Sequence, residues 1–454
     1  MRTFILAVLI VIFITFPSCS TFPTNTGLEN ALGVQTGNVL YVGGTGPGNY
    51  TRIQDAVNDS HNGDSVMVFD ELSPYFETII INSSISLIGE DKNTTVIDGR
   101  MQVVNYVLLL NAEDVFISGF TIQGCQMTVW PNSAIYALGN HSIVTNNIIR
   151  DCPVQAILSL HTSHHIVSNN LIDNCSQGIG FHFSSDNTII HNHLINCAVY
   201  AMYLLSSRDT ISDNTFDCCG QIVIGLALLT NISNNTFDLV SISLEQQSCY
   251  VYVHHNTFTN CSAPIVISRE CRFNHIDSNL ISACEYGIMV CYGRDNTISN
   301  NTIQDNDWIG IIFEYAHSNH IIDNYIARQE CGISLQWSSD NLIENNIIED
   351  NNRGSSQGYG GIEVLYSSYQ NKIFNNTFRN NSIDASFALH SEYFWPHFYY
   401  EKPNLWEGNY WSRPRLFPKL ISGYISTNLP LFFHHIKWIN IDRHPAKKPY
   451  AIGV

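Results

Sequence analysis

Asparagine recurs along this chain at nearly constant intervals. Eleven copies stand 21 to 23 residues apart, except for a last step of 30 residues: Asn147, Asn170, Asn192, Asn214, Asn235, Asn256, Asn279, Asn301, Asn324, Asn346 and Asn376. A period in the twenties is typical of a solenoid, in which each repeat forms one coil stacked on the next. A length of 454 residues suggests about three ordinary domains. The repeat instead predicts one long domain.

Apolar residues flank each of these asparagines at fixed distances. Three positions earlier the residue is always β-branched: Val144, Val167, Ile189, Ile211, Ile232, Val253, Ile276, Ile298, Ile321, Ile343 and Ile373. Two positions later it is always large and apolar: Ile149, Ile172, Leu194, Phe216, Phe237, Phe258, Ile281, Ile303, Ile326, Ile348 and Phe378. A twelfth copy has Phe120 in the asparagine position. Each asparagine therefore separates two short strands.

A third short strand completes each copy, as in the Gly-Ile-Ser-Leu segment at 332–335. Helices of this periodicity are excluded, because Asn, Ser, Asp or Gly interrupts every apolar run after two to five residues. Three strands in about 22 residues predict an all-β, right-handed parallel β-helix whose coils are about 4.8 Å apart. The asparagines then form a ladder, each bonding the backbone of its coil and the amide of the next asparagine.

Both ends of the chain depart from the repeat. Arg2 followed by an apolar run at 4–16 is typical of a secretory signal, and Cys19 is an alternative lipid attachment point. Ile53, Ala56 and Val57 share one face of a short helix that would cover the open first coil. The expected organisation is a signal peptide at 1–20, a flexible leader at 21–37, an N-terminal cap with the first coils at 38–102, regular coils at 103–386 and an aromatic C-terminal cap at 387–454.

Charge limits the choice of partners. The net charge of −18 argues against a nucleic acid. Residues 401–454 hold eight Lys/Arg and three acidic residues, a charge of +5, so the remainder carries −23. This asymmetry favours a tail folded back on an acidic body. No second apolar run is long enough to cross a bilayer after signal removal, so we expect a secreted, cell-surface or periplasmic protein.

Several stretches resemble the NosD-type β-helix family, which is described as periplasmic copper-binding and belongs to the pectin-lyase-like superfamily. The matching stretches are 41–57, with Tyr-Val-Gly-Gly-Thr-Gly-Pro-Gly, 88–99, with Ile-Gly-Glu-Asp-Lys-Asn, the Asn-Asn-Thr-Ile coils, and 404–411, Asn-Leu-Trp-Glu-Gly-Asn-Tyr-Trp. The resemblance implies the fold, and it makes copper handling or maturation of a copper enzyme one possible function. Fold alone does not give function.

Cysteine recurs five residues after the ladder position, in seven of twelve coils. The column contains Cys125, Cys152, Cys175, Cys197, Cys219, Val240, Cys261, Cys284, Asn306, Gln329, Asn351 and Asn381. One interpretation is a thiol column for copper(I), with Cys175, Cys197 and Cys219 as candidate ligands. The other is a stack of small buried side chains, which Val240 favours. The spacing between coils is slightly too large for an unstrained disulfide, so we expect mostly free thiols.

The histidines give no recognisable metal motif. The chain has 18 of them, among them His164 with His165 and His254 with His255, but no His-Glu-x-x-His or Cys-x-x-Cys. Solvated or corner histidines are therefore the expectation.

Aromatic residues stand at matching places after the third strand of several coils: Phe183, Tyr292, Tyr315, Trp337 and Tyr366. Exposed, such a column would offer flat surfaces to sugar rings. Its offset from the preceding isoleucines, however, puts it nominally on the inward face, where it would be ordinary core stacking.

Catalysis by a β-helix hydrolase needs clustered carboxylates, and β-helix lyases combine calcium-binding acids with a basic residue. Asp217 and Asp238 occupy one column of neighbouring coils, and Glu314 and Glu363 share another face. Neither pair has a basic partner fixed by spacing, so surface acids are the plainer interpretation. An irregular loop at 351–360 could wall a cleft.

Three function classes therefore remain. The first is an exported scaffold or binding protein for an extracellular or cell-wall glycan. The second is a polysaccharide lyase or glycoside hydrolase, and the third is copper handling. Copper and calcium are the cofactors that the last two would imply.

Overall fold

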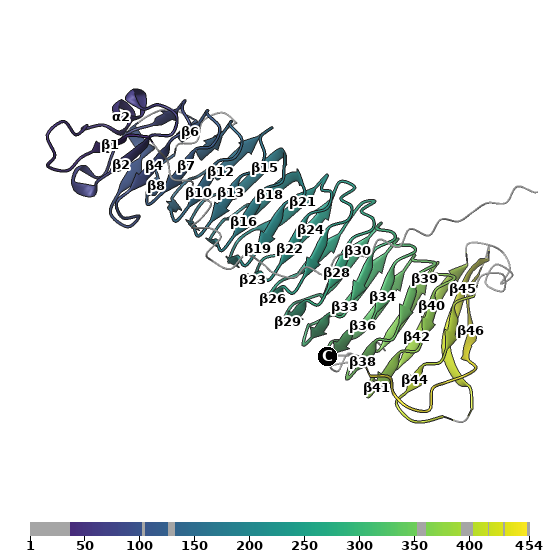
Figure 1. The fold of residues 1–454 in the computed structure, drawn as a ribbon. Helices are drawn as coiled ribbons and strands as arrows, with labels where there is room; N and C mark the ends of the chain where they lie inside the picture. Colours follow the sequence, from purple (N-terminus) through teal and green to yellow (C-terminus); the bar gives the residue numbers. More distant parts are fainter. Residues whose placement is uncertain are drawn as a thin grey trace, which may run out of the picture.

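The computed structural model describes residues 37–101, 105–125, 132–351, 360–391, 403–415, 417–429 and 432–451. Within them the chain forms the predicted solenoid, a long rod of stacked coils (Figure 1). The expected signal peptide and leader, and most of the irregular loop at 351–360, lie outside the described residues. No helix among the described residues is long and apolar enough to cross a membrane.

Each regular coil contributes one strand to each of three parallel columns, while the first and last coils are incomplete. The first column lies directly before the asparagine ladder and consists of β1 (Val39–Val42), β2 (Ser65–Val68), β4 (Ser86–Gly89), β7 (Phe116–Ser118), β10 (Ile143–Thr145), β13 (Ile166–Ser168), β16 (Thr188–Ile190), β19 (Thr210–Ser212), β22 (Asn231–Ser233), β25 (Tyr252–His254), β28 (His275–Asp277), β31 (Thr297–Ser299), β34 (His320–Ile322), β37 (Leu342–Glu344), β40 (Lys372–Phe374) and β43 (Leu405–Glu407).

The second column follows the ladder and forms a separate sheet. Its strands are β5 (Val96–Asp98), β8 (Thr121–Gln123), β11 (Ile148–Arg150), β14 (Leu171–Asp173), β17 (His193–Ile195), β20 (Thr215–Asp217), β23 (Thr236–Asp238), β26 (Thr257–Thr259), β29 (Leu280–Ser282), β32 (Thr302–Gln304), β35 (Tyr325–Ala327), β38 (Ile347–Glu349), β41 (Thr377–Arg379) and β44 (Tyr410–Trp411).

The third column contains the longest strands. They are β3 (Ile79–Ile81), β6 (Tyr106–Leu110), β9 (Ser133–Ala137), β12 (Gln155–Leu160), β15 (Gln177–Ser185), β18 (Tyr200–Ser207), β21 (Gln221–Gly225), β24 (Ile242–Glu245), β27 (Ile265–Ile267), β30 (Ile288–Cys291), β33 (Ile309–Glu314), β36 (Cys331–Gln336), β39 (Ile362–Tyr366), β42 (Ala385–Ser391) and β45 (Lys419–Leu429). Inward Ile, Val, Leu and Phe side chains of all three columns form one continuous core.

The asparagine ladder is present as predicted. Asn256 is typical: its Oδ1 atom accepts hydrogen bonds from the backbone N–H of Asn235 (2.9 Å) and from that residue's side-chain amide (3.0 Å). Its own amide donates to the carbonyl oxygens of Ile232 and His254. The side chain is 1% exposed. Each rung therefore satisfies polar groups that would be costly to bury unpaired.

A second ladder runs along another corner and was not predicted. It occupies the position just before the first strand column, and its asparagines are Asn187, Asn274, Asn296, Asn319, Asn341, Asn371 and Asn404. Residues directly before the rungs of both ladders have positive φ, for example Asn300 (53°) and Asp295 (58°). Asn and Asp tolerate this left-handed conformation better than most residues, which explains the frequent polar pair at each turn.

The N-terminal coil is covered by helix α2 (Ile53–Asp59), confirming the predicted capping helix. Ile53, Ala56 and Val57 are the buried residues of this helix. The carboxylate of Glu77 accepts hydrogen bonds from the backbone N–H groups of Ile53 (2.9 Å) and Gln54 (3.1 Å). A side chain from a neighbouring segment thus caps the helix start and fixes it over the core.

The ladder continues past residue 386, where the regular coils were expected to stop. Asn409 takes the next ladder position, and Asp442 ends the series: its Oδ2 atom accepts hydrogen bonds from the backbone N–H (3.0 Å) and side chain (3.2 Å) of Asn409 and from the indole of Trp411 (2.9 Å). Asp442 ends β46 (Phe432–Asp442), which pairs antiparallel with β45. This hairpin closes the C-terminal end of the rod (Figure 1).

Candidate functional site

The aromatic column lies on the outside of the solenoid. Tyr292, Tyr315, Trp337 and Tyr366 end strands of the third column or follow them directly. Tyr292 is 55% exposed and Tyr315 is 38% exposed. The nominal inward orientation was wrong because all four residues have positive φ, between 47° and 60°. That conformation interrupts the strand alternation on which the inward placement depended.

These four rings stack on one another. Ring centroids are 4.9 Å apart for Tyr292 with Tyr315, 4.9 Å for Tyr315 with Trp337 and 3.9 Å for Trp337 with Tyr366, with planes within 6° of parallel. The faces between the rings are therefore covered by neighbouring rings, and the column offers its exposed ring edges to a ligand. Phe183 does not join this stack; it is 61% exposed and stacks on His161.

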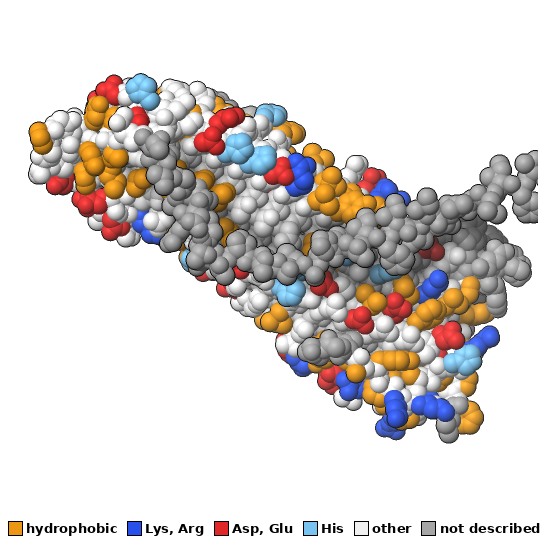
Figure 2. All heavy atoms as spheres, viewed as in Figure 1, with side chains coloured by type: hydrophobic (Ala, Val, Ile, Leu, Met, Phe, Trp, Pro, Cys, Tyr) orange, Lys and Arg blue, Asp and Glu red, His pale blue; other side chains and the backbone are white. Residues whose placement is uncertain are grey.

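Two further aromatic side chains lie on the turn between the third and first columns, three residues beyond the position that Tyr292 occupies. Tyr250 stacks on Phe273 with ring centroids 5.3 Å apart, and both residues have positive φ. Figure 2 shows that exposed hydrophobic, acidic and basic side chains alternate along the visible face of the rod, without a large patch of one sign.

The candidate acidic residues are not assembled into one centre. Asp217 and Asp238 are paired in register on β20 and β23, and Asp238 accepts a hydrogen bond from Asn260 (2.6 Å). Within the described part of the chain, neither forms an ion pair with a basic side chain. Glu314 is on β33 and Glu363 is on β39, with β36 between them and a register offset of two residues, so their Cα atoms are about 12 Å apart by strand geometry.

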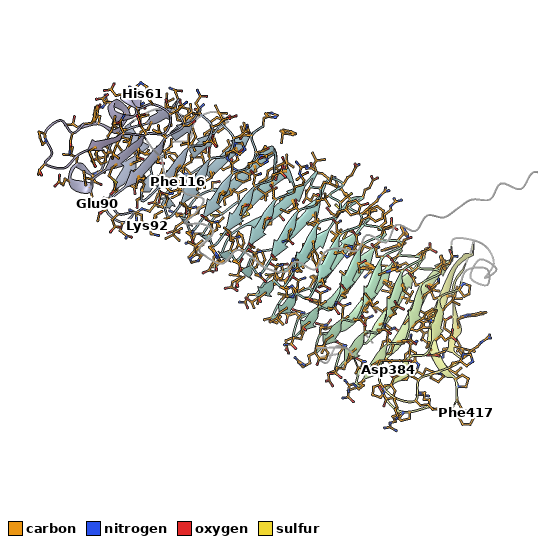
Figure 3. All side chains as sticks on the ribbon, in the orientation of Figure 1. His61, Glu90, Lys92, Phe116, Asp384 and Phe417 are labelled. Carbon is orange, nitrogen blue, oxygen red and sulfur yellow. The ribbon has the colours of Figure 1, made fainter. Side chains whose placement is uncertain are left out.

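A groove lies on the outer face of the last coils. It has a cavity volume of about 910 Å³ and is lined by β39, β42 and the β45–β46 hairpin. Its lining includes Glu363, Asp384, Lys419, Tyr424 and Lys437. Asp384 lies near the C-terminal end of the rod (Figure 3). Of the candidate acidic residues, Glu363 is the one that this groove brings together with other polar groups.

Asp384 and Lys419 form the charged pair of the groove. The Lys419 Nζ atom is 3.9 Å from Asp384 Oδ2 and 5.4 Å from the centre of the Trp411 ring. Asp384 also accepts a hydrogen bond from the Ser412 hydroxyl (3.1 Å). The side chain of Asp384 is only 10% exposed and that of Lys419 only 21%. Burial lowers the pKa of Lys419, partly offset by the Asp384 carboxylate.

Glu363 contributes a nearly buried carboxyl group to the groove. The residue is 6% exposed and accepts a hydrogen bond from the Ser334 hydroxyl (3.1 Å). Burial raises its pKa, because removing the ionised carboxylate from water is unfavourable. The groove thus combines an acid with a raised pKa, a lysine with a lowered pKa and the exposed ring of Tyr424.

Sequence reasoning missed Asp384, Lys419, Tyr424 and Lys437. They lie outside the regular repeat pattern used to choose candidates. The one signal was the basic excess of residues 401–454, which indicated a tail folded on an acidic body. The Lys419–Asp384 ion pair is such a contact.

The cysteine column is buried in the core. Cys175, Cys197 and Cys219 are 2%, 0% and 8% exposed, and every cysteine of the described residues is a free thiol. The Cys219 sulfur accepts the backbone N–H of Cys197 (3.3 Å), just as Asn306 Oδ1 accepts that of Cys284 (3.0 Å). The Cys197 thiol pKa is raised, first by its contact with Cys219 and then by burial. Thiol and asparagine therefore perform the same structural task in successive coils.

Two family models match the chain. One, described as periplasmic copper-binding protein (NosD), matches residues 239–416, and the other, described as right handed beta helix region, matches residues 105–258. The chain is a right-handed parallel β-helix, part of which is similar to the NosD family model. The resemblance expected from the sequence is therefore confirmed.

Solved structures of similar shape include bacteriophage CBA120 tailspike protein 3 (12% identity, TM-score 0.43, covering 91% of this chain and 69% of that one). An exopolygalacturonase from Thermotoga maritima has 10% identity and a TM-score of 0.42, covering 69% and 84%. The mannuronan C-5 epimerase AlgE4 A-module of Azotobacter vinelandii has 12% identity and a TM-score of 0.36, covering 74% and 87%. These similarities carry no argument about activity. No curated protein matches the chain.

Proposed function

We propose that this is an exported β-helix protein that binds a glycan in its C-terminal groove. The observation that carries the proposal is the groove of about 910 Å³, in which Glu363, Asp384, Lys419 and Tyr424 converge. A concave site with an apolar surface and a few well-placed polar groups is the usual form of a ligand site. The expected signal peptide, and the match of residues 239–416 to a family described as periplasmic, support export of the protein.

The groove has the chemistry that a sugar requires. A sugar ring presents C–H groups on its faces and hydroxyl groups around its edge, so it needs a flat apolar surface beside donors and acceptors. Tyr424 is 48% exposed and Ile439 is 52% exposed, and they supply the apolar surface. Lys437 supplies donors, and Glu363 and Asp384 supply acceptors.

The stacked aromatic column supports a secondary role in this binding. Tyr366 ends the stack on β39, the same strand that presents Glu363 to the groove. The faces between the rings of the stack are covered by neighbouring rings, so only ring edges are left for contact with a ligand. We therefore place the glycan in the groove, with the column beside it rather than as the main platform.

A glycan array followed by affinity electrophoresis tests the proposal. We expect the intact protein to bind at least one polysaccharide, and we expect Tyr424→Ala and Lys419→Met each to weaken binding about tenfold or more, which corresponds to about 1.4 kcal/mol. Phe417→Ala is the matched control, because Phe417 is 79% exposed on the same C-terminal cap but does not line the groove (Figure 3). Binding that survives both groove substitutions, or no binding at all, would contradict the proposal.

A second candidate function, hydrolysis or lyase cleavage of the bound glycan, is favoured by the raised pKa of Glu363. Burial raises the pKa of Glu363, so this carboxyl group holds its proton to a higher pH than an ordinary glutamate does, which favours the role of general acid. The test is sugar release by the purified protein. Activity that is lost in Glu363→Gln while binding persists would establish an enzyme, and binding without release would leave a binding protein. Copper handling rests on the family description alone.

A further inference from the structure

Potential metal ligands meet on a turn near the N-terminal end, far from the groove. Glu113, Asp114 and His141 each present one ligand atom, and these atoms all lie within 4.8 Å of one another. Asp114 precedes β7 and His141 precedes β10, so the residues belong to successive coils. Nδ1 of His141 is 3.8 Å from Oδ1 of Asp114.

The backbone holds these residues in register. Asp114, His141 and His164 occupy the same turn position of three coils, two residues before a strand of the first column, with φ values of 55°, 58° and 65°. The rings of His141 and His164 have centroids 5.0 Å apart. The parallel strands that follow are paired, so the side chains leave the rod side by side at the strand spacing. His164 is the next residue of this turn column, but its Nε2 atom lies 4.0 Å from Oδ2 of Asp186 on the following coil.

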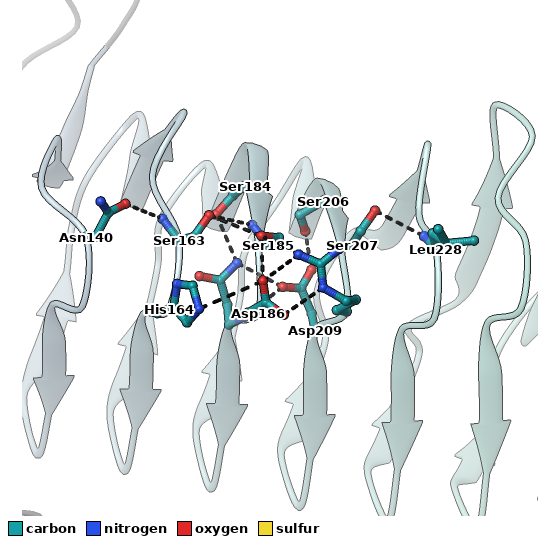
Figure 4. A network of polar contacts seen from close by, with 12 residues as sticks. Asn140, Ser163, His164, Ser184, Ser185, Asp186, Ser206, Ser207, Asp209 and Leu228 are labelled. Carbon is teal, nitrogen blue, oxygen red and sulfur yellow. Dashed lines mark hydrogen bonds and ion pairs between the residues drawn. The ribbon is translucent and has the colours of Figure 1, made fainter.

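Charge on this turn favours a cation. Within the described residues, Glu113 and Asp114 form no ion pair with Lys or Arg, and their nearest basic partner is His141. One coil beyond His164, Asp186 lies 4.0 Å from the His164 ring (Figure 4). Its carboxylate also forms an ion pair with Arg208 at 2.6 Å, so the region without a fixed positive charge ends there. The two carboxylates thus lie beside imidazole nitrogens without a fixed positive charge.

We propose that Glu113, Asp114 and His141 form a three-ligand site for a divalent cation of the zinc type. Imidazole nitrogen and carboxylate oxygen are ligands that Zn²⁺ accepts, at about 2.0 to 2.2 Å. Ligand atoms around one tetrahedral ion are therefore about 3.3 to 3.5 Å apart. Exposed side chains close the remaining gap by small rotations about their χ angles.

The bound ion would act as a clip between coils. It would join the turns of two successive coils in a segment where the described cysteines form no disulfides. This site is independent of the glycan groove, and it lies outside the residues matched by the NosD model.

Isothermal titration with Zn²⁺ alone, after removal of bound metals by a chelator, tests the site. We expect one ion to bind per chain and to raise the unfolding temperature. His141→Ala and Asp114→Asn should each weaken this binding by about tenfold or more, since even the loss of an outer partner of a ligand costs 10- to 100-fold. His191→Ala is the control, because His191 is an exposed histidine at positive φ on a different turn.

Three outcomes would overturn the zinc site. The first is failure of the intact protein to bind Zn²⁺. The second is binding that is unchanged in both variants, which places the ion elsewhere, for example on a thiol. The third is equal affinity for Ca²⁺, which would indicate a hard-cation site and contradict the zinc-type assignment.

Discussion

Asp209 occupies a position in the second ladder where later coils have asparagine. Its Oδ1 atom accepts hydrogen bonds from the backbone N–H (3.0 Å) and from the side-chain amide (2.8 Å) of Asn187. Its Oδ2 atom accepts a hydrogen bond from the Ser206 hydroxyl (Figure 4). The residue is 1% exposed, and burial raises the pKa of its carboxyl group. A ladder position thus holds a buried titratable group.

Asp209→Asn should increase the free energy of unfolding at neutral pH. The pKa of Asp209 is raised in the folded protein, so ionisation is less favourable there than in the unfolded chain. Below its ordinary pKa of 3.8 the carboxyl is neutral in both states and the penalty is absent. The penalty grows as pH rises above 3.8 and levels off above the folded-state pKa. Chemical denaturation of the unaltered protein and of Asp209→Asn, at pH values from below 3.8 to neutral, measures this penalty.

Asp213→Asn is the control for this pH dependence. Asp213 is exposed on the next turn, at positive φ, a conformation that Asn also tolerates. We expect it to leave the pH profile of stability unchanged. If Asp209→Asn increases the free energy of unfolding by the same amount at low and at neutral pH, packing rather than ionisation is responsible.

Asn256→Asp should have the opposite effect in the first ladder. The substitution removes the amide that donates to the carbonyl oxygens of Ile232 and His254 and places a carboxylate beside them. We expect a loss of about 1 to 3 kcal/mol at neutral pH, the usual cost of leaving buried polar groups unsatisfied. Asn234→Asp, on the exposed turn next to the ladder, should change stability by less than about 0.5 kcal/mol. Equal effects at the two positions would show that the ladder hydrogen bonds are not what stabilises this corner.

Cys284→Asn should be tolerated in the cysteine column. The Cys284 sulfur accepts the backbone N–H of Cys261 (3.4 Å), and the following residue of the column is Asn306. An asparagine oxygen can take over that role, so we expect a change of less than about 1 kcal/mol. Cys284→Ala leaves the Cys261 N–H without its acceptor and should cost about 1 to 3 kcal/mol. Urea unfolding under reducing conditions compares the two variants. Similar losses in the free energy of unfolding would mean that the hydrogen bond accepted by the thiol does not stabilise the protein.

Trp337→Asn should destabilise the protein although the side chain is partly exposed. Trp337 lies between Tyr315 and Tyr366 in the aromatic stack, and each ring pair contributes about 0.5 to 1.5 kcal/mol beyond buried area. We expect a loss of about 1 to 3 kcal/mol in thermal or urea unfolding. Asparagine tolerates the positive φ, so the loss reports the stacking. Phe183→Asn, with His161 as its ring partner, should cost less. Equal losses would argue against a special stability of the four-ring stack.

The regular body of the protein was predictable from particular residues. Repetition of Asn with β-branched residues three positions earlier defined the coil length, two strands per coil and the ladder, because every coil must satisfy the same buried groups at the same turn. The capping helix was predictable from Ile53, Ala56 and Val57. The second ladder was missed because its position also holds His165, Asp209, Thr230 and Val251, which hide the asparagine pattern.

The sequence by itself determined the local and periodic features: coil length, strand positions, ladder and the free-thiol column. These depend on interactions between equivalent residues of neighbouring coils, which the period exposes. Only the tertiary structure decided where the aromatic rings point and which charges share a groove. The positive φ of Trp337 directs its side chain outward, although the alternation of side chains along a strand would place it inward. Lys419 contacts Asp384 because the closing hairpin stacks on the last coil. No repeat encodes that contact, since it forms once, where the solenoid ends.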